Sequence, residues 1–320
     1  MVDRLGAPLD EPIFEELAII GVGLIGSSIA RAARRRHAAR RIVLADHSVR
    51  VLERAKALSL GDVVTDDSAR AVRGADCVIL CAPVGANAAI GRLIAPTLRP
   101  GAIISDVGSV KGAVIGALKP ALPAHARLVP AHPVAGTEQS GPDAGFASLF
   151  INRWCILTPP EGTDEEAVTK VRAFWQALGS HVEIMNAAHH DLVLAITSHV
   201  PHLIAYNIVG TAADLEEVTR SEVIKFSAGG FRDFTRIAAS DPTMWRDVFL
   251  HNKDAVLEML GRFNEDLTAL QRMIRREDGD GLFALFTRTR AIRLGIVAEG
   301  QETAAPDFGR RAAESDEPVP

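Results

Sequence analysis

The segment PAHPVAGTEQSG, residues 130–141, holds a histidine among small and apolar residues. An imidazole accepts a proton near neutral pH because its unperturbed pKa is about 6.5, so His132 is suited to proton transfer. The same residue type also serves as a metal ligand or as an ordinary packed loop residue. His132 lies at the end of the apolar run RLVPAHP, and ligands of parallel sheets bind beyond the carboxyl ends of the strands. This position favours a catalytic role.

A second candidate site is the glycine-rich turn GVGLIG, which follows the apolar run LAII. In such a turn the first glycine allows a sharp bend, the second lets backbone amides approach a pyrophosphate, and the third lets the helix pack on the strand. Asp46 ends the next apolar run, where a carboxylate can hold a ribose 2′-hydroxyl. The pattern predicts bound NAD, with contacts from Gly21, Gly23, Leu24, Ile25, Gly26 and Asp46.

Two further features bear on the cofactor. Asp46 would repel a 2′-phosphate, so NADP is less favoured, although the nearby Arg50 could accommodate that group. The run ADCVILCAP ends in Ala82 and Pro83, and we expect both beside the same crevice, where small residues leave room for a ligand. We expect Cys81 to be a small buried side chain rather than a nucleophile.

Composition narrows the function classes. The net charge of −5 and the pI of about 6.1 give no basic surface for nucleic acid or an anionic membrane. The three cysteines show no CxxC spacing, and His199 and His202 lack a third ligand motif, so neither a disulfide framework nor a metal site is expected. No signal peptide is evident, and no uninterrupted apolar run approaches the roughly 18 residues of a membrane span. We therefore expect a cytoplasmic protein.

The elements that position these residues follow from the hydrophobic pattern. In the first half, short apolar runs alternate with helical stretches, which predicts an α/β Rossmann-type domain with a mostly parallel sheet. The predicted strands are residues 17–23, 41–46, 75–83, 102–108, 127–133, 154–160 and 181–186. After Asn186 the pattern is helical, over residues 187–212 and 244–278. The second helical stretch carries an apolar stripe of Val248, Val256, Leu260, Phe263, Leu267 and Leu270.

We predict four segments along the chain. They are an N-terminal extension at 1–16, the Rossmann-type domain at 17–186, an all-α domain at 187–298 and a disordered tail at 299–320.

Three other stretches could bring side chains to a site. SDVGSVKG carries Ser109 and Lys111 just after an apolar run. TSHVPH places His199 and His202 on one helix face, and we expect His199 to make a structural hydrogen bond. In KFSAGGFRDFTRIAASDPTMW the glycine pair at 229–230 is expected to break a helix and deliver the arginines that follow. His189 and His190 are expected to face solvent or to cap a helix.

Five stretches, GVGLIGSS, SDVGSVKG, HPVAGTEQSG, TSHVPH and GGFRDFTRIAASDPTMW, resemble in this order the prephenate/arogenate (cyclohexadienyl) dehydrogenase family of tyrosine biosynthesis. The resemblance covers roughly residues 17–295. It implies NAD-dependent oxidative decarboxylation of prephenate to 4-hydroxyphenylpyruvate and, in a broader enzyme, of arogenate to tyrosine. Hydride passes from the hydroxyl-bearing ring carbon to the nicotinamide, the hydroxyl loses its proton, and carbon dioxide leaves as the ring becomes aromatic. The resemblance also implies a homodimer formed through the helical domain.

The resemblance assigns roles to individual residues. His132 matches the histidine that hydrogen-bonds the substrate hydroxyl and takes its proton, and Ser109 matches the serine that orients both groups. The substrate-binding candidates are Arg236 for a carboxylate, His202 and Trp245 in the pocket wall, Glu138 near the mouth and Arg232 as a nearby cation. For Trp245 a place in the core is an equal alternative.

Other functions fit part of the sequence. A dehydrogenase of the β-hydroxyacid type would use a lysine of the helical domain, and Lys225 and Lys253 are the candidates, although neither lies in such a motif. A non-catalytic NAD-binding sensor would need only the glycine turn. Too few residues flank the predicted domains for a regulatory domain, so tyrosine, if it inhibits, should compete at the active site.

Overall fold

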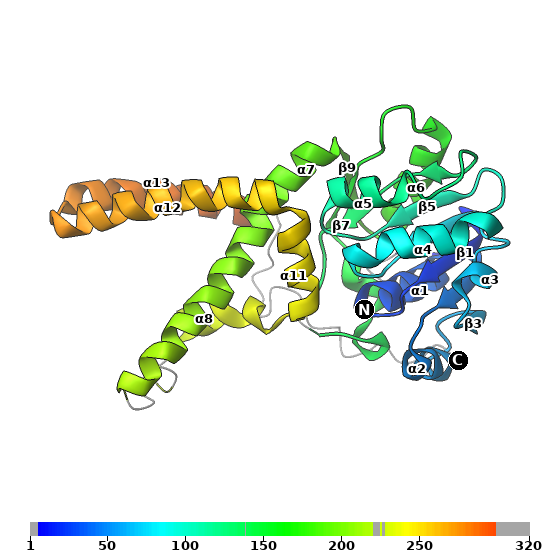
Figure 1. The fold of residues 1–320 in the computed structure, drawn as a ribbon, viewed down its shortest axis with the longest axis horizontal. Helices are drawn as coiled ribbons and strands as arrows, with labels where there is room; N and C mark the ends of the chain where they lie inside the picture. Colours follow the sequence, from blue (N-terminus) through cyan, green and yellow to red (C-terminus); the bar gives the residue numbers. More distant parts are fainter. Residues whose placement is uncertain (1–5, 138, 220–224, 226–227, 299–320) are drawn as a thin grey trace. The chain divides into compact units, whose positions relative to one another are not determined.

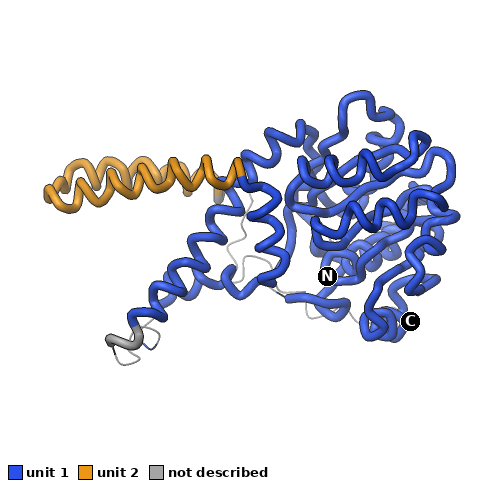
Figure 2. The backbone as a smooth tube through the Cα atoms, in the orientation of Figure 1, with its two compact units in different colours: residues 1–253 blue, residues 254–320 orange. Residues whose placement is uncertain are grey.

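The computed structural model describes residues 6–137, 139–219, 225 and 228–298. The chain divides into two compact units, Met1–Lys253 and Asp254–Pro320, and each is described by itself (Figure 2). The first unit holds both sheets and the helices that cover them (Figure 1).

The larger sheet has six strands in the order β3-β2-β1-β4-β5-β6, and every neighbouring pair is parallel. The order reverses between β1 and β4, and sheets of this kind bind ligands in the crevice at that reversal. The predicted Rossmann-type domain is thereby confirmed. The short strand β3 was not predicted. The strands are β1 (Phe14–Ile20), β2 (Ala39–Ala45), β3 (Val63–Thr65), β4 (Cys77–Leu80), β5 (Ile103–Asp106) and β6 (Arg127–Leu128).

The helices between these strands begin where the strands end, and α1 illustrates why. It starts at Leu24, directly after Gly23 of the glycine turn, and ends in three arginines, which suit the negative end of the helix dipole. His37 then adopts the left-handed conformation, with φ of 54°, and stops the helix. The helices are α1 (Leu24–Arg36), α2 (Val49–Ala57), α3 (Ser68–Ala71), α4 (Asn87–Ile94) and α5 (Lys111–Leu118), with 3₁₀ turns η1 (Val84–Ala86) and η2 (Ala95–Thr97).

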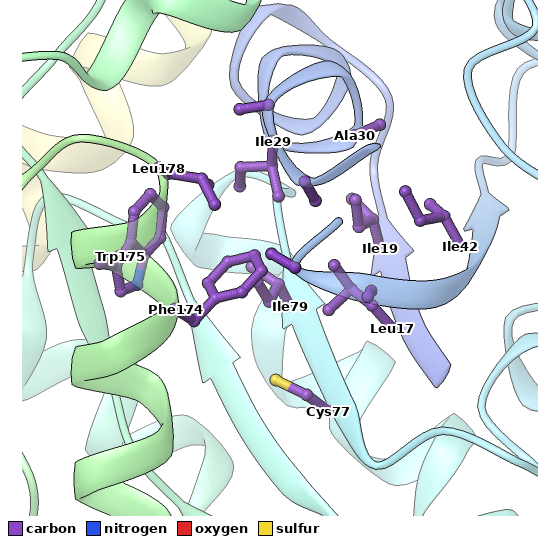
Figure 3. Close-up of a cluster of buried hydrophobic side chains, with 14 of the residues drawn as sticks. Leu17, Ile19, Ile29, Ala30, Ile42, Cys77, Ile79, Phe174, Trp175 and Leu178 are labelled. Carbon is purple, nitrogen blue, oxygen red and sulfur yellow. The ribbon is translucent and has the colours of Figure 1, made fainter. Parts of the chain in front are cut away.

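The sheet is covered on both faces, so its strands are apolar on both sides. Leu17 and Ile19 of β1 face one core cluster, together with Phe174 and Trp175 (Figure 3). The intervening Ala18 and Ile20 face a second cluster that also includes residues of β4 and β5. This packing fixes β1, and with it the glycine turn that follows.

A second, three-stranded sheet has the order β7-β8-β9, with β7–β8 antiparallel and β8–β9 parallel. The run RLVPAHP does not form one strand, because the chain passes from one sheet to the other within it. The amide of Val129 still donates to Ile104, whereas the carbonyl of Pro130 accepts from Thr158 beside β8. The elements of the second sheet and of its connections are β7 (Ala131–Pro133), η3 (Pro142–Ala144), η4 (Ala147–Phe150), β8 (Trp154–Leu157), α6 (Glu165–Ala177) and β9 (His181–Ile184).

A long helical run follows, made of α7 (Ala187–Leu194), the π turn η5 (Ala195–His199) and α8 (Val200–Thr219). Pro201 cannot donate a backbone hydrogen bond, and the widened turn just before it accommodates that gap. The later helices of this unit are α10 (Gly229–Thr235), η6 (Arg236–Ala239) and α11 (Pro242–His251). The glycine pair forms the first turn of α10, directly after the extended Ala228, and residues 226–227 before it lie outside the described residues, so the expected helix break stays a prediction.

By length and composition alone, one helical stretch, Ala187–Leu215, could cross a membrane; its most apolar window has mean hydropathy 1.5 and is 28% buried. The sequence prediction considered only uninterrupted apolar runs, and polar residues interrupt this one. Among them, Asp191 and His199 are buried and hydrogen-bonded to groups outside the stretch. Such bonds are typical of a helix that packs within a folded domain.

The second unit contains most of α12 (Lys253–Arg275) and all of α13 (Gly279–Ala298). The helical pattern predicted over 244–278 is confirmed, and two helices share it, since α11 ends at His251 and Asn252, with φ of −105° and ψ of 30°, separates it from α12. Of the predicted stripe on α12, Val256 is buried, Leu267 is exposed and the others are half-buried.

Candidate active site

The glycine turn shows which of its glycines are required by packing and which face open space. Gly21 has φ of +98°, and a Cβ there would lie 2.5 Å from the carbonyl oxygen of Cys81. A Cβ on Gly26 would overlap the carbonyl oxygen of Gly21, whereas one on Gly23 would meet nothing within 4 Å. The space beside Gly23, at the start of α1, therefore fits a pyrophosphate approached by backbone amides.

Asp46 directly follows β2 and reaches the glycine turn. Its Oδ2 accepts a hydrogen bond from the amide of Val22 at 2.9 Å, and its Oδ1 accepts one from the amide of Ser48 at 2.9 Å. The side chain is only 10% exposed. The carboxylate thus supports the turn and lies at the edge where a ribose would bind.

The loop after β4 lies beside the same turn. The amide of Cys81 donates to the carbonyl of Ile20 at 2.7 Å, and the amide of Ala82 is near Gly21. Ala82 is half-buried and Pro83 exposed. Burial raises the pKa of the Cys81 thiol, so this side chain stays protonated and is a poor nucleophile. The predicted cofactor residues therefore come together at one edge of the parallel sheet.

His132 lies in β7, paired with Ile156 of β8, and is only 7% exposed. Its Nδ1 lies 2.8 Å from Nε2 of His190. Burial lowers the pKa of His132 well below 6.5, and the charges of His190, Lys111 and His199 lower it further. The imidazole is therefore neutral at pH 7 and able to accept a proton.

His190 was expected to face solvent or cap a helix, and this expectation was wrong. It is fully buried, because α7 turns this side chain toward β7, while its neighbour His189 is exposed. Its Nδ1 lies 2.8 Å from Oδ1 of Asp191. Asp191 in turn accepts the amides of Lys111 and Gly112, each at 2.8 Å, at the start of α5.

Lys111 is completely buried and ties two strands together. Its Nζ lies 2.6 Å from Oδ2 of Asp106 and 2.6 Å from the carbonyl oxygen of Ala131. Burial lowers the pKa of Lys111, and the Asp106 carboxylate opposes that effect. The ammonium thus joins the end of β5 to β7 beside His132. Sequence reasoning noted Lys111 without a role, and its position after a strand was the available signal.

A second group of side chains gathers around Trp245 on α11. The indole stacks on His202 of α8, with ring centroids 3.7 Å apart, and packs with Val110 and Val248. The core reading of Trp245 is confirmed, since the indole is buried in this small apolar cluster, and its place in a substrate pocket stays a prediction. Burial lowers the pKa of His202 and the charge of Arg236 adds to this, so the guanidinium lies near this stack.

His199 connects the side chains around Trp245 to the hydrogen-bonded series of His132, His190 and Asp191. Its Nδ1 lies 3.0 Å from Nδ2 of Asn252, which also donates to the backbone oxygen of Asp191 at 2.9 Å. Burial lowers the pKa of His199 to about 4. His199 thus makes a hydrogen bond within the protein, and Asn252 is a residue that sequence reasoning missed.

Other predicted residues are not joined to the site. Ser109 is half-buried, and in the described chain its hydroxyl makes no hydrogen bond to His132, whose Nδ1 is instead bonded to His190. Arg232 is exposed on α10, and Glu138 lies outside the described residues. No cluster of three or more His, Cys, Asp or Glu side chains that could hold a metal occurs within the described ranges.

Comparison with known protein families gives two adjacent matches. Residues 29–184 match the prephenate dehydrogenase nucleotide-binding domain, and residues 186–288 match the prephenate dehydrogenase dimerization domain. The two matches together cover most of the chain.

Individual proteins agree with these matches. A cyclohexadienyl dehydrogenase of Zymomonas mobilis is 46% identical over 90% of this chain and 98% of its own length. A crystal structure of Aquifex aeolicus prephenate dehydrogenase with hydroxyphenyl propionate and NAD+ superposes with a TM-score of 0.83 at 34% identity, covering 88% of this chain and 98% of that one. Synechocystis arogenate dehydrogenase gives a TM-score of 0.75 at 26% identity, over 88% and 99%.

Proposed function

Because the chain belongs to the prephenate dehydrogenase family, we propose that it converts prephenate to 4-hydroxyphenylpyruvate and that His132 takes the substrate's hydroxyl proton. The chain is an NAD-dependent oxidoreductase of this family. Membership of this family argues against the two alternative functions, a dehydrogenase of the β-hydroxyacid type and a non-catalytic NAD-binding sensor. The observation that carries the role of His132 is its buried, neutral imidazole, with Nδ1 bonded to His190 and Nε2 left for the substrate.

The protein's residues divide the work between binding and proton transfer. NAD, when bound at the glycine turn, supplies the hydride acceptor, and Gly23 and Asp46 are suited to its pyrophosphate and ribose. The Nε2 of His132 accepts the proton of the substrate hydroxyl as the ring carbon that bears this hydroxyl is oxidised. Loss of carbon dioxide then makes the ring aromatic and places the electron pair on the ring oxygen, which takes back the proton held on Nε2 of His132.

The residues around Trp245 are the proposed substrate-binding residues. The stacked His202 and Trp245 offer a flat, partly apolar wall for a cyclohexadiene ring. Arg236 nearby offers a planar, permanently charged group for a carboxylate. We also propose that Ser109 and Arg232 contact the substrate as the family motif suggests.

Arogenate is a second candidate substrate. The cyclohexadienyl dehydrogenase of Zymomonas mobilis and the arogenate dehydrogenase of Synechocystis are among the relatives, which favours a broad enzyme. Arogenate carries an ammonium where prephenate carries a keto group, and Glu138 is the proposed partner for that charge. Tyrosine, which resembles the products, would compete at this site.

We further propose that the enzyme is a cytoplasmic homodimer. The dimerization domain matched at 186–288 bears many exposed apolar side chains, which a second copy would cover. The buried polar contacts of Asp191 and His199 support a packed location for the helix Ala187–Leu215, rather than a lipid one.

The first experiment follows NADH formation with NAD and either prephenate or arogenate in separate assays. Turnover with prephenate supports the proposal, and turnover with both makes the enzyme a cyclohexadienyl dehydrogenase. His132→Asn keeps an amide near the position of Nδ1 and removes Nε2, so kcat should fall about 10²–10⁴-fold while the Kd for NAD stays unchanged. His189→Asn, at an exposed histidine, is the matched control. Unchanged turnover in His132→Asn would contradict the proposed role.

A further inference from the structure

We infer that His190 is a positioning residue, which together with Asp191 holds His132 in the tautomer that carries its proton on Nδ1 and its lone pair on Nε2. The inference rests on the proposed function, in which His132 is the base. It gives a role to two residues that no sequence motif marked. The three side chains form one buried chain with two hydrogen bonds of 2.8 Å.

The donor and acceptor of each hydrogen bond in this series follow from the Asp191 carboxylate at its end. An ionised carboxylate only accepts hydrogen bonds, so the contact between Asp191 and His190 requires a proton on Nδ1 of His190. A neutral imidazole carries one proton, and Nε2 of His190 is then an acceptor. The facing Nδ1 of His132 must therefore be the donor across 2.8 Å. Its own Nε2 is left without a proton.

The carboxylate that starts this chain is fixed by the fold. Both oxygens of Asp191 accept backbone amides of α5, from Lys111 and Gly112, at 2.8 Å. The start of a helix carries partial positive charge, which favours an ionised carboxylate there. Asn252 holds the backbone of Asp191 from the other side, through a bond of 2.9 Å to its carbonyl oxygen. The Asp191 side chain therefore has little freedom to rotate, and its carboxylate remains the acceptor for Nδ1 of His190.

The same chain serves the protonated state. When Nε2 of His132 gains a proton, the new positive charge lies one hydrogen bond from His190 and two from the Asp191 carboxylate. Burial strongly disfavours charge on this imidazole, and Lys111 opposes it. Asp191 is the nearest negative group connected to His132 by hydrogen bonds, and it offsets part of that cost without taking the proton itself.

The test compares two substitutions of His190. His190→Gln places an amide oxygen near the former Nε2, so His132 keeps an acceptor for its Nδ1 proton. His190→Ala removes the acceptor. We expect kcat to fall about 100-fold in His190→Ala and no more than about tenfold in His190→Gln, with the KM for prephenate and the Kd for NAD within about twofold of wild type. His189→Ala and His189→Gln are the matched controls on the exposed neighbour.

A second measurement does not depend on turnover. In ¹⁵N-histidine-labelled wild-type protein, with the His132 signals identified by their loss in His132→Asn, the spectrum should show a proton on Nδ1 and none on Nε2. In His190→Ala this signature should give way to a mixture of tautomers. A purely structural role for His190 would leave the tautomer of His132 unchanged.

The outcomes separate this inference from the proposed function. If His132→Asn is inactive while His190→Ala keeps full kcat, the inference fails and the proposed function stands. An Nε2-protonated His132 in the wild type also overturns it. If His190→Ala does not fold, as judged by circular dichroism and NAD binding, two results decide: the wild-type spectrum, and whether the kcat of His190→Gln stays within about tenfold of wild type. Turnover that survives in His132→Asn refutes the proposed function instead.

Discussion

Three glycines within one turn meet three different constraints. Gly21 adopts a backbone conformation that side-chain-bearing residues rarely reach, and it also touches the loop after β4. Gly26 lies against the carbonyl of Gly21, which brings α1 close to β1. Gly23 is not constrained by any neighbouring atom, so its lack of a side chain serves something outside the protein.

This difference predicts opposite behaviour on substitution by alanine. Gly21→Ala and Gly26→Ala should lower the free energy of unfolding by about 2 kcal/mol or more, because both introduce clashes with backbone atoms. Gly23→Ala should leave stability unchanged and raise the Kd for NAD at least about tenfold. Thermal unfolding and NAD titration measure the two effects. Normal NAD binding by Gly23→Ala would show that the pyrophosphate lies elsewhere.

The pH dependence of catalysis follows from the lowered pKa of His132. A base acts when it is deprotonated, and lowering its pKa extends the deprotonated form to more acidic solution. We therefore expect kcat/KM to stay constant from pH 8 to below 6.5 and to fall only at lower pH. A steady-state pH profile measures this, and an acid limb centred at or above 6.5 would contradict it. The titratable groups whose charges act on this imidazole are His190, Lys111 and His199, and Asp191 is connected to it through His190.

Sequence reasoning found part of this site and missed part of it, for a physical reason. His132 follows a predicted strand, and the glycine turn follows another, so both are marked by local pattern. His190 and its exposed neighbour His189 have the same local surroundings, and only the direction of α7 separates them. Asp191 acts through the amides of α5, some 80 residues away in sequence. Contacts of that kind depend on tertiary packing and leave no local signal.

At the level of elements, one junction within the first unit joins the helical run to the sheet domain. The side chain of Asp191 on α7 caps the start of α5, and Asn252, just after α11, holds the backbone of Asp191 and Nδ1 of His199. Nδ1 of His199 thus depends on this one amide group, whereas the carbonyl of Asp191 also accepts the amide of Ala195. All three residues are buried.

The junction predicts that Asn252 is important for stability. Asn252→Ala leaves the buried Nδ1 of His199 without its donor and removes one of two donors to the Asp191 carbonyl, which should lower the free energy of unfolding by about 1–3 kcal/mol. Asn264→Ala, the same substitution at an exposed position of α12, should cost nothing. Denaturant unfolding of both variants tests this. Equal stability of the two would mean that water replaces the lost donor.

A comparison of the elements shows which of them hydrophobic periodicity is sufficient to predict. Strands of the parallel sheet were predicted because burial on both faces produces apolar runs such as LAII. The second sheet was not foreseen, because the run RLVPAHP is apolar throughout and does not indicate that it serves two sheets. Likewise, the pattern over residues 244–278 remains helical across Asn252, and only the turn there divides it.

At the scale of the whole molecule, apolar side chains remain exposed on several helices. In the first unit they include Leu192, Ile196, Ile208, Val209 and Leu215, and in the second Leu257, Phe283, Phe286, Ile292 and Leu294. Most of them lie within residues 186–288, the matched dimerization domain. A monomer rarely leaves so much apolar surface in water.

We therefore expect a mass near twice 34.2 kDa in solution. Phe283→Glu, at a side chain that is 74% exposed, should shift the protein toward monomer, because an interface would bury the new charge. Leu93→Glu on α4, at a side chain 56% exposed outside the dimerization domain, is the control and should leave the mass unchanged. Light scattering coupled to gel filtration measures both. A monomeric wild type would contradict the proposed homodimer.

The π turn at Ala195–His199 determines how the long helix responds to a change in length. From His190 to His202, a regular α-helix makes three turns and about 120° more, which would point the two imidazoles to different sides. A π turn takes up roughly one extra residue and so recovers about 100° of that rotation. Removing one residue within it would leave an ordinary helix, whose eleven steps from His190 give the same net rotation, so the later side chains keep their direction relative to His190. A one-residue deletion at Ile196 or Thr197 should therefore be tolerated, whereas a one-residue deletion that keeps the π turn would rotate His202 by about 100° relative to His190.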